Sequence, residues 1–136
     1  METKGSDVWT ISPGATIYEA IDEMARRGVG ALPVVSRDRL IGIVSERDYA
    51  RKVILQGRSS KETSVMDIMT PSPVAVTPET AVDVCLRMMT LKHIRHLPVL
   101  DRGKLAGIVS IGDLVKAIIS AQAYTIEQLH TYIATG

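Results

Sequence analysis

Apolar residues follow the same pattern in both halves of the chain. In each half, an apolar stripe at helical spacing precedes two short, almost continuous apolar runs, at 31–36 and 40–45 in the first half and at 96–100 and 105–110 in the second. Runs of this length that are rich in Val and Ile predict strands buried on both faces, whereas the stripes predict amphipathic helices. The pattern therefore predicts an α/β fold in both halves.

The predicted helices have recognisable starts and ends. Thr16 can cap a first helix with Glu19 as its capping-box partner, and Gly28 is suited to end it. Ser45 can cap a second helix that extends to about Gln56. The remaining predicted elements are short strands at 8–11 and 74–76, a short helix at 65–69, a helix at 80–91, and a last helix from near Ile111 to Ile133 with a break near Ser120.

The chain is a duplication. Residues 12–54 align with residues 77–119 without a gap, at an offset of 65 residues, and thirteen positions are identical. A motif of about 60 residues is only marginally stable alone, so we expect the two copies to pack on each other through their sheets, about a pseudo-twofold axis. We place the first motif at 1–60 and the second, with a C-terminal helical extension, at 61–136.

Composition narrows the classes of function and the location. The 136 residues are 46% hydrophobic, and 16 basic residues nearly balance 15 acidic ones. This balance disfavours nucleic-acid binding, and no apolar run reaches the roughly 18 residues that cross a bilayer. The first residues lack the apolar region of a signal peptide, and Cys85, the only cysteine, is expected in the core. We therefore expect a cytoplasmic protein that binds neither membrane nor nucleic acid.

Each copy ends its second core strand with Gly-Ile-Val-Ser-x-x-Asp. This sequence places Ser45 and Asp48, and in the second copy Ser110 and Asp113, at the corner where a strand becomes a helix. A serine hydroxyl and free backbone N–H groups at a helix start can hold a phosphate, and a carboxylate one turn later can accept two ribose hydroxyls. The same residues also fit a capping box, and the sequence leaves both interpretations open.

Basic residues lie close to these corners in the sequence. Arg95 and His96 lie at the start of the first core strand of the second copy and can face a phosphate near Ser110, while Arg47 lies inside the corner of the first copy. Surface or capping roles for the histidines and an exposed ion pair for Arg47 are equally open. His93 and His96 lack a third metal ligand, and no nucleophile–base pair is evident, so we expect neither a metal site nor an enzyme.

The doubled pattern Leu-Pro-Val-Val/Leu followed by Gly-Ile-Val-Ser-x-x-Asp, with Pro13 and Pro78 before the helices, resembles the cystathionine-β-synthase (CBS) domain. The tandem pair resembles a Bateman module, and the whole chain is similar to stand-alone CBS-pair proteins. The resemblance implies two β-α-β-β-α motifs, two clefts between them, and a homodimer of such pairs. It also implies an adenosine-type ligand such as AMP, ADP, ATP or NAD, and no catalytic cofactor.

The resemblance also assigns residues to the two clefts. One cleft would use Asp113 for the ribose, Ser110 and His96 toward the phosphate, and Val29, Lys4, Gly5 and Val8 around the adenine. The pseudo-symmetric cleft would use Asp48, Ser45, Ile94, Ala31, Thr70 and Pro71, and further phosphate contacts would come from Arg95 and Arg47. Because only the second copy adds Arg95 and His96, the cleft at Asp113 is our first choice for a phosphate-bearing ligand.

Two functions fit these features. The first is a regulatory module in signal transduction, which binds an adenosine-containing nucleotide and changes its dimer geometry to act on an unidentified regulated protein. The alternative is a structural interaction dimer with vestigial clefts, in which the apolar stripe at 123–133 carries recognition.

Overall fold

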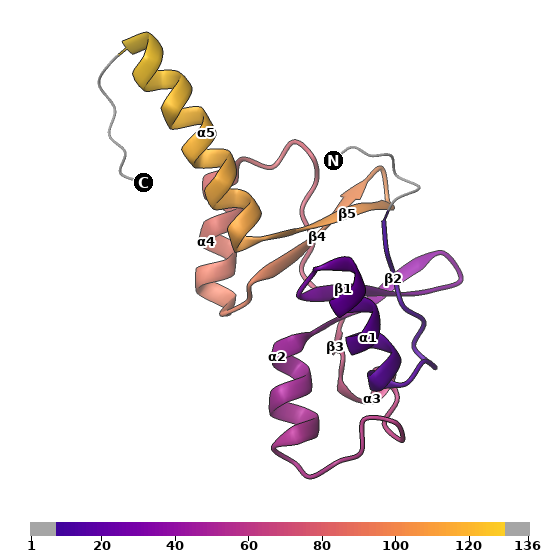
Figure 1. Cartoon of the computed structure of the whole chain (residues 1–136). Helices are drawn as coiled ribbons and strands as arrows, with labels where there is room; N and C mark the ends of the chain where they lie inside the picture. The colour runs from indigo at the N-terminus through magenta and orange to yellow at the C-terminus, as the bar shows by residue number, and fades with distance from the viewer. Residues whose placement is uncertain (1–7, 130–136) are drawn as a thin grey trace.

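The computed structural model describes residues 8–129, with side chains as far as Ser120. Figure 1 shows two units that each consist of a β-hairpin flanked by helices. The elements in order are α1 (Ile17–Arg27), β1 (Ala31–Ser36), β2 (Arg39–Ser45), α2 (Glu46–Tyr49), a π-helical turn (Ala50–Ile54), α3 (Val65–Ile68), β3 (Thr70–Pro71), α4 (Val82–Lys92), β4 (His96–Asp101), β5 (Lys104–Ser110) and α5 (Ile111–Leu129). The predicted α/β class is confirmed.

The two hairpins have the same register. β1 pairs antiparallel with β2 so that Ala31 lies opposite Ser45, and β4 pairs with β5 so that His96 lies opposite Ser110. Each hairpin turns through two residues with positive φ, as a two-residue type I′ turn requires: Arg37 and Asp38 in the first, Arg102 and Gly103 in the second. The equal registers bring Ser45 and Ser110 to equivalent corners.

The predicted outer strands at 8–11 and 74–76 are reduced to single parallel bridges, formed by Ile11 with β1 and by Val76 with β4. Prolines explain this difference. Ile11 N donates to Pro33 O and Ile11 O accepts from Val35 N, both at 3.0 Å. To extend the parallel pairing, the next backbone hydrogen bonds would need the N–H of Pro33 in one direction and the N–H of Pro13 in the other. Proline has no backbone N–H. The second motif has the same two interruptions, at Pro98 and Pro78.

The helices begin close to the predicted positions. α1 has the predicted capping box, with Glu19 N donating to Thr16 Oγ1 at 3.1 Å and Thr16 N donating to Glu19 Oε1 at 2.8 Å, and it ends at Gly28 with φ of 69°. α4 ends in the same left-handed conformation at His93, with φ of 56°. The helix predicted to reach Gln56 is instead a short α-helix that continues as the π-helical turn.

α5 runs without the predicted break near Ser120 to Leu129, the last described residue. The apolar stripe predicted at 123–133 falls on side chains outside the described part, so its packing on a partner stays a prediction. No helix within residues 8–129 combines the length and apolar character needed to cross a membrane.

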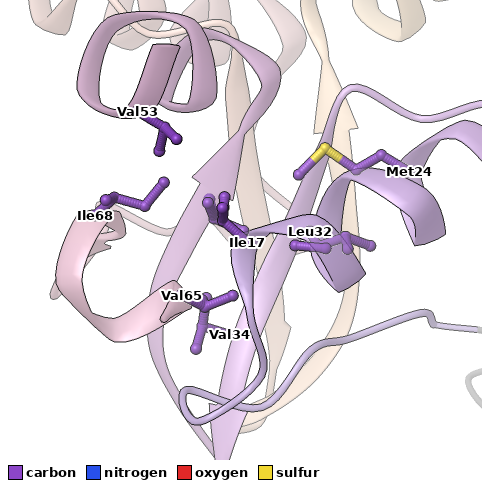
Figure 2. Close-up of a cluster of buried hydrophobic side chains, with 9 residues drawn as sticks. Ile17, Met24, Leu32, Val34, Val53, Val65 and Ile68 are labelled. Atoms are coloured by element: carbon purple, nitrogen blue, oxygen red, sulfur yellow. The ribbon is translucent and has the colours of Figure 1, made fainter. Parts of the chain in front are cut away.

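Each motif has its own buried cluster. Figure 2 shows the larger one, in which Ile17 of α1 lies among side chains from β1, the π-helical turn and α3. A smaller cluster around Leu97 joins α4, β4 and α5, and it contains the predicted core residue Cys85. The two motifs contact each other through β2 and β5, in accordance with the predicted packing through their sheets.

The segment at 60–71 packs on the first motif although it follows the predicted boundary. Val65 and Ile68 of α3 belong to the larger buried cluster, and Val65 N donates to Ala15 O at 2.8 Å. β3 then adds to the edge of β2, with Thr70 opposite Ile43. The pairing of β3 with β2 brings Thr70 to the corner at the end of β2. The boundary between 60 and 61 stays a prediction.

Candidate functional site

The two Ser-x-x-Asp corners both form capping boxes. At the first, Asp48 N donates to Ser45 Oγ at 3.1 Å, and Ser45 N donates to Asp48 Oδ2 at 2.9 Å. At the second, Asp113 N donates to Ser110 Oγ at 3.0 Å, and Ser110 N donates to Asp113 Oδ2 at 2.9 Å. The capping role that the sequence left open is therefore real, and a ligand that used Asp48 or Asp113 would bind to a carboxylate that already acts as a cap.

A cleft of about 750 Å³ lies between the first corner and the end of α4, a size that suits a small-molecule ligand. It is lined by Gly30, Ile43, Ser45, Glu46, Arg47, Asp48, Arg51, Lys52, Thr70, Ser72, Pro73, Val74, Lys92, His93, Ile94, Arg95 and His96. The first motif contributes the corner and its helix, and the second contributes the residues at 92–96. In Figure 1 this region lies where α2 faces the start of β4.

The cleft unites seven of the predicted site residues: Ser45, Arg47, Asp48, Thr70, Ile94, Arg95 and His96. The placement of two of them differs from our expectation, because Arg95 and His96 were assigned to the corner at Asp113. The backbone of Arg95 is indeed next to that corner, since Ile111 N donates to Arg95 O at 3.0 Å. The side chain of His96 nevertheless reaches the first motif, where a Cβ on Gly30 would lie 3.4 Å from His96 Nε2. Arg95 and His96 therefore line the cleft at the Asp48 corner, with His96 also close to Asp113.

The other predicted site residues lie elsewhere or outside the described part. Ala31 is buried, and Pro71 is exposed on β3; neither lines the cleft. Val29 packs against the larger buried cluster. Ser110 and Asp113 form the second corner, and Val8 is half-buried. Lys4 and Gly5 fall outside residues 8–129, so the adenine contacts predicted for the cleft at Asp113 stay a prediction.

Three basic residues of the cleft were missed at the sequence level: Arg51, Lys52 and Lys92. Arg51 and Lys52 follow Asp48 by three and four residues, which places them on the same helical face, and this spacing was an available signal. Lys52 Nζ lies 3.2 Å from Asp48 Oδ1 and donates to Ile68 O at 3.0 Å. Lys92 gave no such signal, because its approach to the cleft depends on how the two motifs pack.

A hydrogen bond joins the two motifs across the cleft. Arg47 Nη1 donates to His93 O at 3.2 Å, and His93 is the left-handed residue that ends α4. Arg47 therefore makes a tertiary contact rather than the exposed ion pair that was its alternative interpretation.

His96 is half-buried between the two corners. Burial lowers its pKa below the ordinary value, against the opposing effects of the nearby carboxylates of Asp113 and Glu46. The imidazole is therefore mainly neutral at pH 7 and can act as a hydrogen-bond donor rather than as a fixed charge.

Comparison with known proteins identifies the family that has this architecture. The profile of the CBS domain matches residues 3–54 and again residues 65–120. The chain belongs to the CBS-domain family. The mitochondrial CBS domain-containing protein CBSX3 of Arabidopsis thaliana is 44% identical over 137 residues, which cover 97% of this chain and 66% of that relative. The cytoplasmic location stays a prediction, since this relative is mitochondrial.

Solved structures of CBS-pair proteins have the same fold. A CBS-domain protein from Burkholderia ambifaria is 52% identical, with a TM-score of 0.82 and 87% of both chains covered. CBSX2 of Arabidopsis thaliana, whose structure was solved in complex with AMP, is 30% identical, with a TM-score of 0.69 over 85% of this chain and 90% of that one. Stand-alone CBS pairs of this kind are typically regulatory modules, and one similar member of the family binds an adenine nucleotide.

Proposed function

We propose that this protein is a regulatory CBS pair that binds an adenosine-containing nucleotide of the AMP, ADP, ATP or NAD class in the cleft at Ser45–Asp48. The observation that carries this proposal is the union of the Ser45–Asp48 corner with Arg95 and His96 of the other motif in one cleft. The AMP complex of the similar protein CBSX2 supports the choice of ligand.

The lining can be assigned by chemistry. Ile43, Val74 and Ile94 offer an apolar surface suited to a purine ring, and Asp48 offers carboxylate oxygens for the ribose hydroxyls. Arg47 and Arg95 can bind phosphate through charge-assisted hydrogen bonds. Because Asp48 Oδ1 is paired with Lys52, ribose binding must rearrange that ion pair or share the oxygen with it.

Regulation would follow from the position of the cleft between the motifs. A phosphate bound at Arg47 competes with His93 O for the guanidinium, so occupancy alters a contact between the two motifs. A ligand shifts such an equilibrium only by the difference in its affinity for the two arrangements. We further propose that the nucleotide is bound and released unchanged, which chromatography of nucleotides after incubation with the protein would test.

The test of binding is isothermal titration calorimetry with AMP, ADP, ATP and NAD on the wild type, Asp48→Asn and Asp113→Asn. Both variants remove one carboxylate from a capping box, so Asp113→Asn is a matched control for the loss of the cap. We expect Asp48→Asn to weaken binding by about tenfold or more and Asp113→Asn to change it little. Absence of binding of all four nucleotides to the wild type would refute the proposal, and loss of binding only in Asp113→Asn would move the site to the other corner.

One observation favours the alternative function, an interaction dimer. Large apolar side chains are exposed on the neighbouring helices α4 and α5: Leu91 at 74%, Ile111 at 38%, Val115 at 40% and Ile119 at 53%. The three on α5 recur every four residues and so share one face. We propose that this face forms the homodimer interface. Val115→Glu/Ile119→Glu should then halve the mass measured by light scattering, and an unchanged mass would exclude this face.

A further inference from the structure

The cleft at Ser45–Asp48 carries more positive charge than one phosphate needs. Five basic side chains line it (Arg47, Arg51, Lys52, Lys92 and Arg95), against two carboxylates (Glu46 and Asp48). The chain as a whole has a net charge of only +1, so this excess is a local property of the cleft.

Two of the five basic groups already have partners in the protein. Lys52 is paired with Asp48 and bonded to Ile68 O, and Arg47 is bonded to His93 O. By contrast, Arg51, Lys92 and Arg95 form no ion pair and no side-chain hydrogen bond within the described residues. All three are exposed at the cleft. Three cations gathered without protein partners repel one another, and an anion with several charges relieves that repulsion.

The pseudo-symmetric corner shows that the fold does not require Arg47 and Arg95. At the offset of 65 residues, Arg47 corresponds to Gly112 and Arg95 to Gly30, whereas Arg51 corresponds to the basic Lys116. Lys92 corresponds to Arg27, which is held by Glu23 at 2.8 Å and lies over the ring of Trp9 at 5.0 Å. Both corners have the same capping box, so Arg47 and Arg95, which only the Asp48 corner has, serve a purpose other than capping.

Two of the three free cations, Arg51 and Lys92, are available for a second phosphate. Arg51 follows Arg47 by four residues on the helical segment, which places it about one turn further along the same face. Lys92 is the last residue of α4 and precedes Arg95 by three residues, with the left-handed His93 between them. Arg51 and Lys92 therefore line the cleft in addition to Arg47 and Arg95, and can provide charge for a second phosphate.

We propose that the cleft at Ser45–Asp48 binds adenosine compounds with two or three phosphates more tightly than the monophosphate, and that Arg51 and Lys92 bind the second phosphate. This inference rests on the proposed function and specifies the ligand class of that site. Arg47 and Arg95 contact the phosphate next to the ribose, which all of these ligands share.

The experiment is calorimetry with adenosine, AMP, ADP and ATP in metal-free buffer. The proteins are the wild type, the double variant Arg51→Gln/Lys92→Gln, and the control Arg39→Gln/Lys104→Gln. The control removes the same two kinds of charge from exposed positions at the turn ends of β2 and β5, away from the cleft. We expect ADP to bind the wild type and the control about tenfold more tightly than AMP. In the double variant, the affinity for ADP should fall to the affinity for AMP. The affinity for AMP itself should change less than about twofold relative to the wild type.

The outcomes separate this inference from the proposed function. Equal or tighter binding of AMP relative to ADP in the wild type overturns the inference and leaves the proposed function standing. A preference for ADP that survives in the double variant overturns the assignment to Arg51 and Lys92. If none of the four compounds binds, the proposed function itself fails. The salt dependence provides a check on the wild type alone, because the preference for ADP should shrink between about 0.05 M and about 0.5 M salt.

Discussion

Gly42 allows β3 to approach β2 closely, and its replacement tests whether that approach positions the cleft. A Cβ at Gly42 would lie 2.5 Å from Met69 Sδ and 2.9 Å from Thr70 O. The Met69 side chain is flexible and can rotate away, but the carbonyl belongs to the paired backbone of β3. Thr70 lies opposite Ile43, and Ser72 N donates to Ile41 O at 3.1 Å. Gly42→Ala must therefore displace β3 or strain β2.

Overpacking of this kind costs about 1–3 kcal/mol of unfolding free energy. For a chain of 136 residues, each kcal/mol lowers the melting temperature by about 3–5 °C, so Gly42→Ala should melt about 3–15 °C below the wild type. The matched control is Gly14→Ala, because a Cβ there meets no atom within 4 Å. Its stability should change by less than about 1 kcal/mol.

The assay combines thermal unfolding, followed by circular dichroism, with nucleotide titration. Because β3 carries Thr70 to the cleft, and the residues at 72–74 follow it there, Gly42→Ala should also weaken nucleotide binding below the melting transition. A melting temperature within about 1 °C of the wild type would refute the packing argument. Reduced stability with unchanged affinity would show that β3 does not position the binding residues.

Three further predictions follow from single side chains. Ile17→Ala, which empties a fully buried position, should lower the unfolding free energy by about 2–5 kcal/mol in urea titrations, whereas Tyr18→Ala at the 49% exposed neighbour should cost less than about 1 kcal/mol. Burial lowers the pKa of His96 from 6.5, so the unfolded state takes up its proton first. Stability should thus fall as the pH drops below 6.5, and less so in His96→Gln; an equal fall in both proteins would contradict this. Burial raises the pKa of the Cys85 thiol, so it should react with a thiol reagent slowly in the native protein and rapidly in urea, and equal rates would contradict its burial.

Periodicity and turn chemistry predicted most of the fold. The apolar runs identified both hairpins, and Thr16, Glu19 and Gly28 bounded α1 to the residue. The predicted lengths of the outer strands were wrong. The reason is visible in the sequence, because Pro13 and Pro33 lack the N–H groups that would extend the pairing. The π-helical turn and the pairing of β3 with Gly42 depend on tertiary packing, which local patterns do not encode.

The candidate site was predicted in its components but not in its assembly. Ser45 and Asp48 were found because their role is local to one strand–helix corner. Arg95 and His96 were found as basic residues and then assigned to the adjacent corner of their own motif. Backbone proximity supported that assignment, yet a side chain at the end of a hairpin can extend to either side. Only the packing of the motifs decides which corner receives the charge.

Capping and ligand binding are therefore not competing explanations of the Ser-x-x-Asp corners. The two caps have hydrogen bonds of nearly the same length, so duplication has kept the local fold of both corners intact. If capping were the whole role, the surroundings of the two corners would have no reason to differ in charge. They differ at the positions that face the open cleft, where Arg47 and Arg95 stand in place of Gly112 and Gly30. The second corner thus serves as an internal reference for the first: the shared capping box is required by the fold, and Arg47 and Arg95, which only the Asp48 corner has, are residues that a charged ligand would use.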